Sequence, residues 1–461
     1  MNRRDFLKIC AGTGALAMMP RIGRGTPNTN DPLWINIQAT GGWDSALVGD
    51  PKPGLRTKGL MRDIYVYGAP ILGANGQPTV GQGTIHGATA LQTRMTPGGG
   101  ITYSAFADLH GDPANPNYPY KCFFPTYYDR VTLFCGIETG TLNHEVGIRY
   151  CASGSNNQGF PCFATQVAYV RGSDRPLAFM NLGGYAETAG LIAATPLVGA
   201  ALPNLARLVA PNDLSGDNNG TDYIVTPQAL SLVQQAHARR TGRLRDKLLL
   251  PEQRRGIDSL TAAESGQSAL TALQFNGSDQ SQKNVVQVGI DAFRQGMAVS
   301  MNIPVGGFDT HGDNEQGQAL ALFELFETIK LIINETEAPS NGKTPVPAVV
   351  VVTSDFGRSP YYRNAGTDHW PVTSMMVVQN KQALALGLAI PTNRVIGGTS
   401  NGDENQALRS AKVDPKNFNV DPNGVTMTPG HVMRALRRLA KIDDPKLAAW
   451  PLTVDKDLAV G

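Results

Sequence analysis

Several features that would point to other protein classes are missing from this sequence of 461 residues. Only 17% of the residues are charged, the net charge is +2 and no basic cluster occurs, so nucleic-acid binding has no electrostatic support. No Gly-x-Gly-x-x-Gly motif follows a predicted strand and no cysteine set suits an iron–sulfur cluster, which argues against an oxidoreductase. These absences leave an ordinary folded protein, with one elaborated domain or two.

Cysteine is scarce, and its placement is informative. Of five cysteines, one lies near the N-terminus, and the other four crowd into one stretch: Cys122, Cys135, Cys151 and Cys162. They contain no Cys-x-x-Cys pair, so a zinc knuckle is disfavoured. In an oxidising compartment their even number predicts two disulfides that staple a single region, with a connectivity that the spacing does not fix.

The N-terminus carries a targeting pattern. Arg3 and Arg4 precede a short apolar run from Ile9 to Met19. A membrane-spanning helix needs about 20 apolar residues, so this run is too short to span a membrane. A short apolar run after a positively charged start is typical of signal peptides. The arginine pair predicts a twin-arginine (Tat) signal over residues 1–25, with the Tat export machinery as partner and a periplasmic or cell-envelope location. Cleavage and an uncleaved anchor both stay open, because no clear Ala-x-Ala site follows.

Strand and helix patterns alternate along the rest of the chain and predict one α/β domain over residues 33–455 with a mostly parallel sheet. Two insertions interrupt it. Residues 50–128 are rich in Gly, Pro, Asn and aromatics and predict a long irregular excursion. Residues 226–275 predict two or three amphipathic helices that form a surface lobe.

Polar side chains follow four of the predicted strands. The β-branched run from Ala348 to Ser354 ends at Asp355, and His369 follows in a Gly-bounded loop. In parallel sheets ligands bind beyond the carboxyl ends of the strands, where such loops meet. The other three loops contribute Asp44, the turn Thr141–His144 and the segment Asp309–Asp313. Mixed carboxylates and imidazoles predict a divalent metal site or an oxyanion site, and for a metal site zinc, calcium, magnesium and manganese are all open. Each residue also has a plain structural alternative, such as Asp44 as a helix cap.

Five motifs occur in an order that resembles one family: Arg-Arg-x-Phe-Leu-Lys at 3–8, Gly-Gly-x-Asp at 41–44, Asp-Thr-His-x-x-Asn at 309–314, Ser-Asp-Phe-Gly-Arg-x-Pro at 354–360 and Gly-Thr-Asp-His-Trp-Pro at 366–371. The family is the Tat-exported bacterial domain of unknown function 1501, which looks like a branch of the alkaline phosphatase and sulfatase superfamily. The resemblance implies an alkaline-phosphatase-like, doubly wound, mostly parallel sheet with helices on both faces.

The resemblance also implies roles for eight residues. Asp44, Asp309, His311, Asp355 and His369 would bind metal, Thr141 would attack, and Arg358 or His144 would hold the oxyanion. The implied activity is metal-dependent hydrolysis of a phosphate or sulfate ester, carried by a small molecule or a polysaccharide, through in-line attack.

A second hypothesis is a non-catalytic envelope protein that keeps this fold as a binding or assembly scaffold. It is motivated by departures from the superfamily pattern: Asn143 stands in the turn where a nucleophile is expected, and Phe356 stands where a ligand usually follows Asp355. This hypothesis predicts an envelope protein partner that contacts the aromatic-rich segment 103–128.

Overall fold

The structure is a computed structural model that describes residues 30–52, 93–107, 122–209, 224–247, 273, 275–312, 314–339, 342–363, 366–402, 406–443 and 445–460. The twin-arginine segment, much of the irregular excursion and the second half of the helical lobe lie outside the described residues. Among the described residues, no helix combines the length and the apolar character needed to cross a bilayer.

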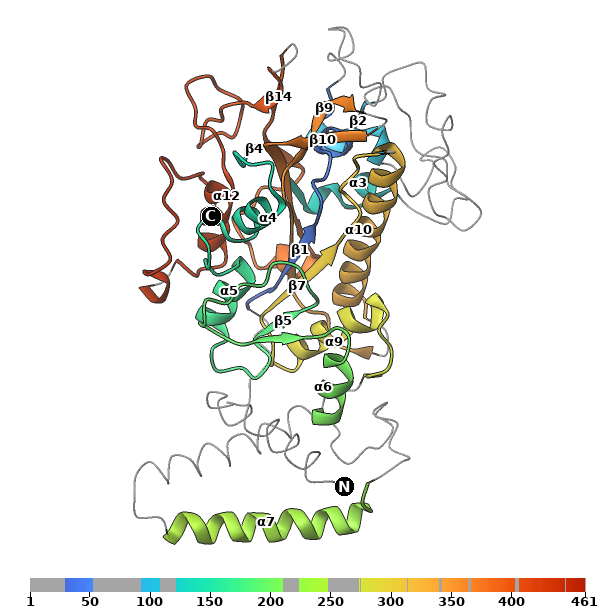
Figure 1. The fold of residues 1–461 in the computed structure, drawn as a ribbon, viewed down its shortest axis with the longest axis vertical. Helices are drawn as coiled ribbons and strands as arrows, with labels where there is room; N and C mark the ends of the chain where they lie inside the picture. The colour runs from blue at the N-terminus through green and yellow to red at the C-terminus, as the bar shows by residue number, and fades with distance from the viewer. Residues whose placement is uncertain are drawn as a thin grey trace.

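An eight-stranded mixed sheet forms the centre of the molecule, in the order β12-β4-β11-β8-β1-β7-β5-β6 (Figure 1). Five of its seven neighbouring pairs are parallel, and β11 is antiparallel to both of its neighbours. This confirms an α/β fold with a mostly parallel sheet. The strands are Arg394–Gly397 (β12), Val131–Glu138 (β4), Val372–Gln379 (β11), Ala348–Ser354 (β8), Leu33–Ala39 (β1), Ser300–Val305 (β7), Phe179–Asn181 (β5) and Ala194–Pro196 (β6).

The central strands are buried on both faces of the sheet because both alternating sets of positions along them carry apolar side chains. Ile35 and Val350 belong to the apolar cluster on one face of the sheet, whereas Trp34 and Val349 belong to the cluster on the other. Successive side chains of a strand point to opposite faces, so a continuous apolar run serves both. Each such side chain contributes about 1.5–3 kcal/mol on burial.

Helices cover both faces of the sheet (Figure 1). On one face lie Gln282–Arg294 (α9) and Asn314–Glu337 (α10), and on the other lie His144–Ser153 (α4), Phe163–Arg171 (α5) and Pro429–Leu439 (α12). The remaining α-helices are Ser45–Val48 (α2), Phe123–Tyr127 (α3), Ala201–Val209 (α6), Pro227–Lys247 (α7) and Lys381–Ala385 (α11). Single 3-10 turns occur at Pro97–Gly99, Ala105–Ala107, Tyr128–Arg130 and Pro445–Leu447. α7, the described part of the predicted helical lobe, lies apart from the α/β body.

The described residues also form three small hairpins: Thr93–Met95 (β2) with Thr102–Ser104 (β3), Gly357–Arg363 (β9) with Gly366–Trp370 (β10), and Thr399–Asn401 (β13) with Ala407–Ser410 (β14). The β9–β10 hairpin corrects one sequence prediction, which placed His369 in a loop. His369 lies in β10 and pairs with Arg358 of β9. The two residues are therefore fixed by backbone hydrogen bonds on neighbouring strands.

The prediction of two disulfides is wrong for this structure. No disulfide joins Cys122, Cys135, Cys151 or Cys162, and all four are buried. Cys135 lies in β4 and Cys151 in α4, where each thiol faces a backbone carbonyl, that of Gly49 at 3.8 Å and that of Asp355 at 3.7 Å. The cysteines fill core positions on different elements, although they are close in sequence. Burial raises the pKa of the Cys135 and Cys151 thiols well above the usual value.

Candidate metal centre

The predicted site residues come together at one edge of the sheet. β1, β7 and β8 are mutually parallel, and β4 runs in the same direction because β11 is antiparallel to both β4 and β8. The carboxyl ends of these four strands therefore share an edge, as the sequence predicted. The chain leaves them as the Gly41–Asp44 turn, the turn before α4, the loop after β7 and the β9–β10 hairpin.

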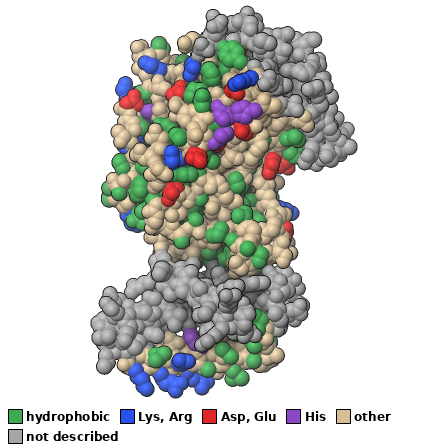
Figure 2. Space-filling view, viewed as in Figure 1, with side chains coloured by type: hydrophobic (Ala, Val, Ile, Leu, Met, Phe, Trp, Pro, Cys, Tyr) green, Lys and Arg blue, Asp and Glu red, His purple; other side chains and the backbone are tan. Residues whose placement is uncertain are grey.

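His144, Asp309 and His369 form the centre of the site. Each offers one ligand atom, and these atoms all lie within 4.8 Å of one another. Nε2 of His144 is 3.5 Å from Oδ2 of Asp309, and Nε2 of His369 is 3.2 Å from Oδ1. Nε2 of His311 also approaches, at 3.1 Å from Oδ1 of Asp309 and 2.9 Å from Nε2 of His369. We call these four residues the histidine–aspartate cluster; histidine side chains gather visibly at the surface in Figure 2.

The second nitrogen of each imidazole in the cluster faces an oxygen acceptor. Nδ1 of His144 lies 2.7 Å from Oδ2 of Asp355, and Nδ1 of His369 lies 2.8 Å from the carbonyl oxygen of Leu142. Nδ1 of His311 lies 3.4 Å from Oδ1 of Asp368. A neutral imidazole has a single N–H, and a ring that donates it from Nδ1 to the oxygen acceptor carries its lone pair on Nε2.

The Nε2 lone pairs therefore converge on the carboxylate of Asp309. Lone pairs and carboxylate oxygens repel unless a cation or added protons lie between them. Imidazoles whose Nδ1–H is held by a carboxylate or a backbone carbonyl are the usual arrangement at a metal ion. An ion with bonds of about 2.0–2.1 Å in tetrahedral geometry places its ligand atoms about 3.3–3.4 Å apart. The separations of 3.2 Å between Nε2 of His369 and Oδ1 of Asp309 and of 3.5 Å between Nε2 of His144 and Oδ2 of Asp309 are close to that spacing.

Asp355 lies behind His144 and not within the cluster. Its Oδ2 accepts the N–H of Gly41 at 3.1 Å in addition to the His144 contact. Its Oδ1 is buried and has no hydrogen-bond partner among the residues that the structure describes. Burial raises the pKa of this carboxyl, and the hydrogen bonds from His144 and Gly41 oppose that rise only in part. The sequence predicted Asp355 as a direct ligand, whereas the structure places its carboxylate against a histidine.

Arg358 is buried and holds the loops of the site together. Its guanidinium donates to the carbonyl oxygens of Gly42 at 2.9 Å, Thr367 at 3.0 Å and Gly41, and to Oδ1 of Asp309 at 2.7 Å. Partial burial acts to raise the pKa of Asp309, but the hydrogen bond and the positive charge of Arg358 act against it, and the pKa lies below its usual value. The structure thus engages Arg358 with the protein itself, where the sequence suggested an oxyanion contact.

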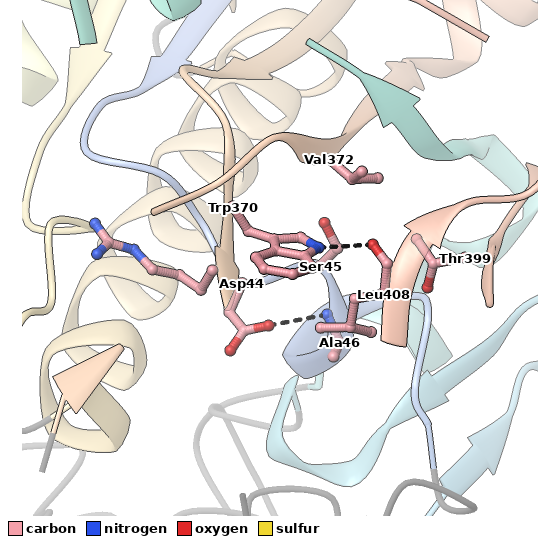
Figure 3. Close-up of a pocket in the computed structure, with 8 residues that line it drawn as sticks. Asp44, Ser45, Ala46, Trp370, Val372, Thr399 and Leu408 are labelled. Carbon is pink, nitrogen blue, oxygen red and sulfur yellow. Dashed lines mark hydrogen bonds between the residues drawn. The ribbon is translucent and has the colours of Figure 1, made fainter. Parts of the chain in front are cut away.

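Asp44 and Thr141 both lie in turns that follow strands at this edge of the sheet. The carboxylate of Asp44 caps α2 by accepting the N–H of Ala46 at 3.1 Å, which is the structural alternative that the sequence left open. Asp44 also lines a small pocket with Ser45 and Trp370 (Figure 3). The hydroxyl of Thr141 accepts the N–H of Asn143 at 3.1 Å in the turn before α4.

Sequence reasoning missed Gln318, which joins two of the loops. From α10 its Oε1 accepts the N–H of Asp44 at 3.0 Å, and its Nε2 donates to the carbonyl oxygen of Phe308 at 2.9 Å. The side chain is fully buried. No local signal distinguishes this glutamine from others on a helix, since its partners are remote in sequence. Asp313, part of the predicted loop, lies outside the described residues.

Comparison with known protein families gives a match over part of the chain. Residues 200–380 match the model of a family described as "Protein of unknown function (DUF1501)". No curated protein matches the chain. The matched range contains Asp309, His311, Asp355 and His369, and it stops short of the N-terminal motifs and of His144. The chain is thus similar to this family over residues 200–380, which is less than half of its length.

Proposed function

We propose that this protein is an exported, metal-dependent hydrolase of phosphate or sulfate esters with an alkaline-phosphatase-like fold. The observation that carries the proposal is the convergence of three imidazole nitrogens on the carboxylate of Asp309 at the carboxyl edge of a mostly parallel sheet. A sheet with helices on both faces is compatible with the superfamily that the motifs resemble. Export by the Tat route rests on residues 1–25 and is part of the proposal.

The histidine–aspartate cluster supplies the donors for the ion. When bound, a divalent ion would lower the pKa of the attacking group and stabilise negative charge on the ester oxygens. Arg358 fixes Asp309 and so acts on the reaction through the position of that carboxylate. The first turn of α4 presents backbone N–H groups beside His144, and a helix N-terminus favours an anionic phosphate or sulfate group.

Thr141 is the proposed nucleophile because it lies in the turn that leads into α4. In the structure its hydroxyl accepts the N–H of Asn143, which uses one of the two lone pairs of the oxygen and leaves the other for attack. Replacing Thr141 distinguishes attack by its hydroxyl from attack by water. Loss of hydrolysis in Thr141→Ala supports attack by the hydroxyl, whereas retained hydrolysis that still depends on Asp309 indicates attack by water.

The scaffold hypothesis requires a surface for a partner protein. Buried aromatic side chains in segment 103–128 cannot form that surface. Within segment 103–128, the described side chains of Tyr103, Phe106, Phe123 and Phe124 are all buried. The ring of Phe123 stacks on Phe326 of α10 with centroids 4.5 Å apart. These aromatic rings pack the core, so a partner on this segment would have to contact its other residues.

The test is hydrolysis of p-nitrophenyl phosphate, bis-p-nitrophenyl phosphate and p-nitrophenyl sulfate by the full chain purified after export. We expect Asp309→Asn and His369→Ala to reduce the rate at least about 100-fold. His237→Ala changes an exposed histidine on α7 and serves as the matched control with an unchanged rate. Equal rates in all four proteins, or no hydrolysis of any ester by metal-loaded protein, would overturn the proposal.

A further inference from the structure

We infer that His144 is itself a ligand of the ion, that Asp355 and Asp368 are positioning residues which hold imidazoles, and that the site therefore selects a zinc-class ion over magnesium or calcium. The inference rests on the metal site of the proposed function and deepens it. It assigns an imidazole to the place where the resemblance puts a nucleophile, and it removes Asp355 from the set of direct ligands.

His144 is held firmly in the direction of the cluster. It is the first residue of α4, and the side chain of Asn143 caps that helix by accepting the N–H of Val146 at 3.1 Å. Its Nδ1 is fixed by Asp355, which leaves Nε2 directed at Asp309. A residue with one ring nitrogen anchored and the other aimed at two further donors has the arrangement of a metal ligand.

Phe356 forms the apolar wall behind the two central imidazoles. Its ring is buried, with its centroid 4.7 Å from that of His144 and 4.2 Å from that of His369. In the superfamily pattern a metal ligand usually stands at this position, and this chain departs from the pattern with Phe356. In this structure Phe356 packs against both imidazoles and restricts their orientation. His144 would supply the ligand that the superfamily pattern has at position 356.

Asp355 and Asp368 each orient a histidine ring, and they differ in how exposed their side chains are. Both oppose an Nδ1 atom, that of His144 at 2.7 Å and that of His311 at 3.4 Å. Asp355 is buried, whereas Asp368 is about half exposed. A carboxylate in this position sets the tautomer and orientation of the ligating ring, and its loss weakens metal binding about 10–100-fold.

The donor set decides the class of ion. The nitrogen atoms of three imidazoles surround a single carboxylate, that of Asp309. Magnesium and calcium prefer six or more oxygen ligands, while zinc and its neighbours accept imidazole nitrogen in four-coordinate sites. A nitrogen-rich, oxygen-poor centre of this size therefore suits zinc or cobalt(II).

The experiment measures binding of zinc, cobalt(II), magnesium and calcium to the metal-stripped full chain by calorimetry, with the visible absorption of cobalt(II) as a report on coordination. We expect zinc and cobalt(II) to bind at least about 100-fold more tightly than magnesium or calcium. His144→Ala should abolish the tetrahedral cobalt(II) spectrum. Asp355→Asn should weaken zinc binding about 10–100-fold, with His237→Ala unchanged.

Asp368→Asn keeps the test decisive if Asp355→Asn fails to fold, because Asp368 is at the surface. Its zinc affinity should fall in the same direction. Tighter binding of magnesium or calcium, or zinc binding that is insensitive to His144→Ala, would overturn the inference. The two proposals can fail separately. Zinc binding without ester hydrolysis removes the proposed function alone, and hydrolysis supported only by magnesium removes this inference alone.

Discussion

Nδ1 of His144 lies 2.7 Å from Oδ2 of Asp355, although 211 positions separate the two residues in the chain. The contact exists because α4 packs against the end of β8. Gly147 permits that packing, since a Cβ atom built on it would lie 2.3 Å from the carbonyl oxygen of Asp355. The approach of one helix to one strand end thus sets the position of a histidine in the cluster.

Gly147→Ala should therefore lower stability, although alanine is the better helix former. A backbone oxygen stands where the new methyl group must go, so α4 has to shift, at a cost of about 1–3 kcal/mol. Gly242→Ala in α7 is the matched control, because nothing lies within 4 Å of its Cβ position and helix propensity favours it by up to about 1 kcal/mol. Urea unfolding of both variants compares them. Equal stability of Gly147→Ala and the parent protein would contradict the packing.

Arg358→Met should destabilise the protein by at least about 2 kcal/mol, because the carbonyl oxygens of Gly41, Gly42 and Thr367 would lose a buried donor. Arg363→Met removes an exposed guanidinium of the same hairpin and should change stability by less than about 0.5 kcal/mol. Thermal unfolding measures both. A similar small change in the two variants would show that the buried network is not formed.

The four buried cysteines should all be thiols. Alkylation of the unfolded, unreduced protein followed by intact mass measurement should label Cys122, Cys135, Cys151 and Cys162. Prior reduction should not raise the number of labels at these positions. An increase in the number of labels after reduction would show that the protein contains disulfides, as the sequence predicted.

The C-terminal segment should loosen in acid. Nε2 of His431 lies 2.7 Å from Oδ1 of Asp455. Slight burial acts to raise the pKa of Asp455, but the contact with His431 outweighs it and lowers that pKa. A carboxyl with a lowered folded-state pKa contributes stability above its unfolded pKa and loses it as pH falls through the folded value.

For the exposed Asp455 this contribution is at most about 1 kcal/mol. Hydrogen exchange or limited proteolysis at residues 445–460 should therefore rise as pH falls below about 3.9, the ordinary value for aspartate. Asp455→Asn should show the faster exchange already at neutral pH. The idea fails if that variant and the parent protein exchange alike at every pH.

The sequence allowed the strand ends to be predicted because each carries a local pattern. The apolar run before Asp355 identifies a central strand, and parallel strands share one edge, so Asp309, Asp355 and His369 could be placed together in advance. Their roles could not, because contacts across 211 positions decide which carboxylate faces the cluster and which faces a histidine. Asp44 and Gln318 illustrate the same limit, since helix capping and a remote amide contact fix their roles.

The disulfide prediction failed for a related reason. Even numbers of cysteines are a sound guide in small secreted domains that lack a large core. Here Cys135 and Cys151 occupy a strand and a helix within a large apolar interior, where a thiol behaves as a small apolar side chain. The spacing in the sequence carries no information about which element each cysteine joins.

Metal content measured by mass spectrometry on the full chain purified after export tests the central claim most directly. We predict about one equivalent of a divalent ion per chain, lost in both His144→Ala and His369→Ala and retained in His237→Ala. Folded, stable protein that carries no ion and gains none on incubation with zinc would contradict the account and favour the scaffold hypothesis.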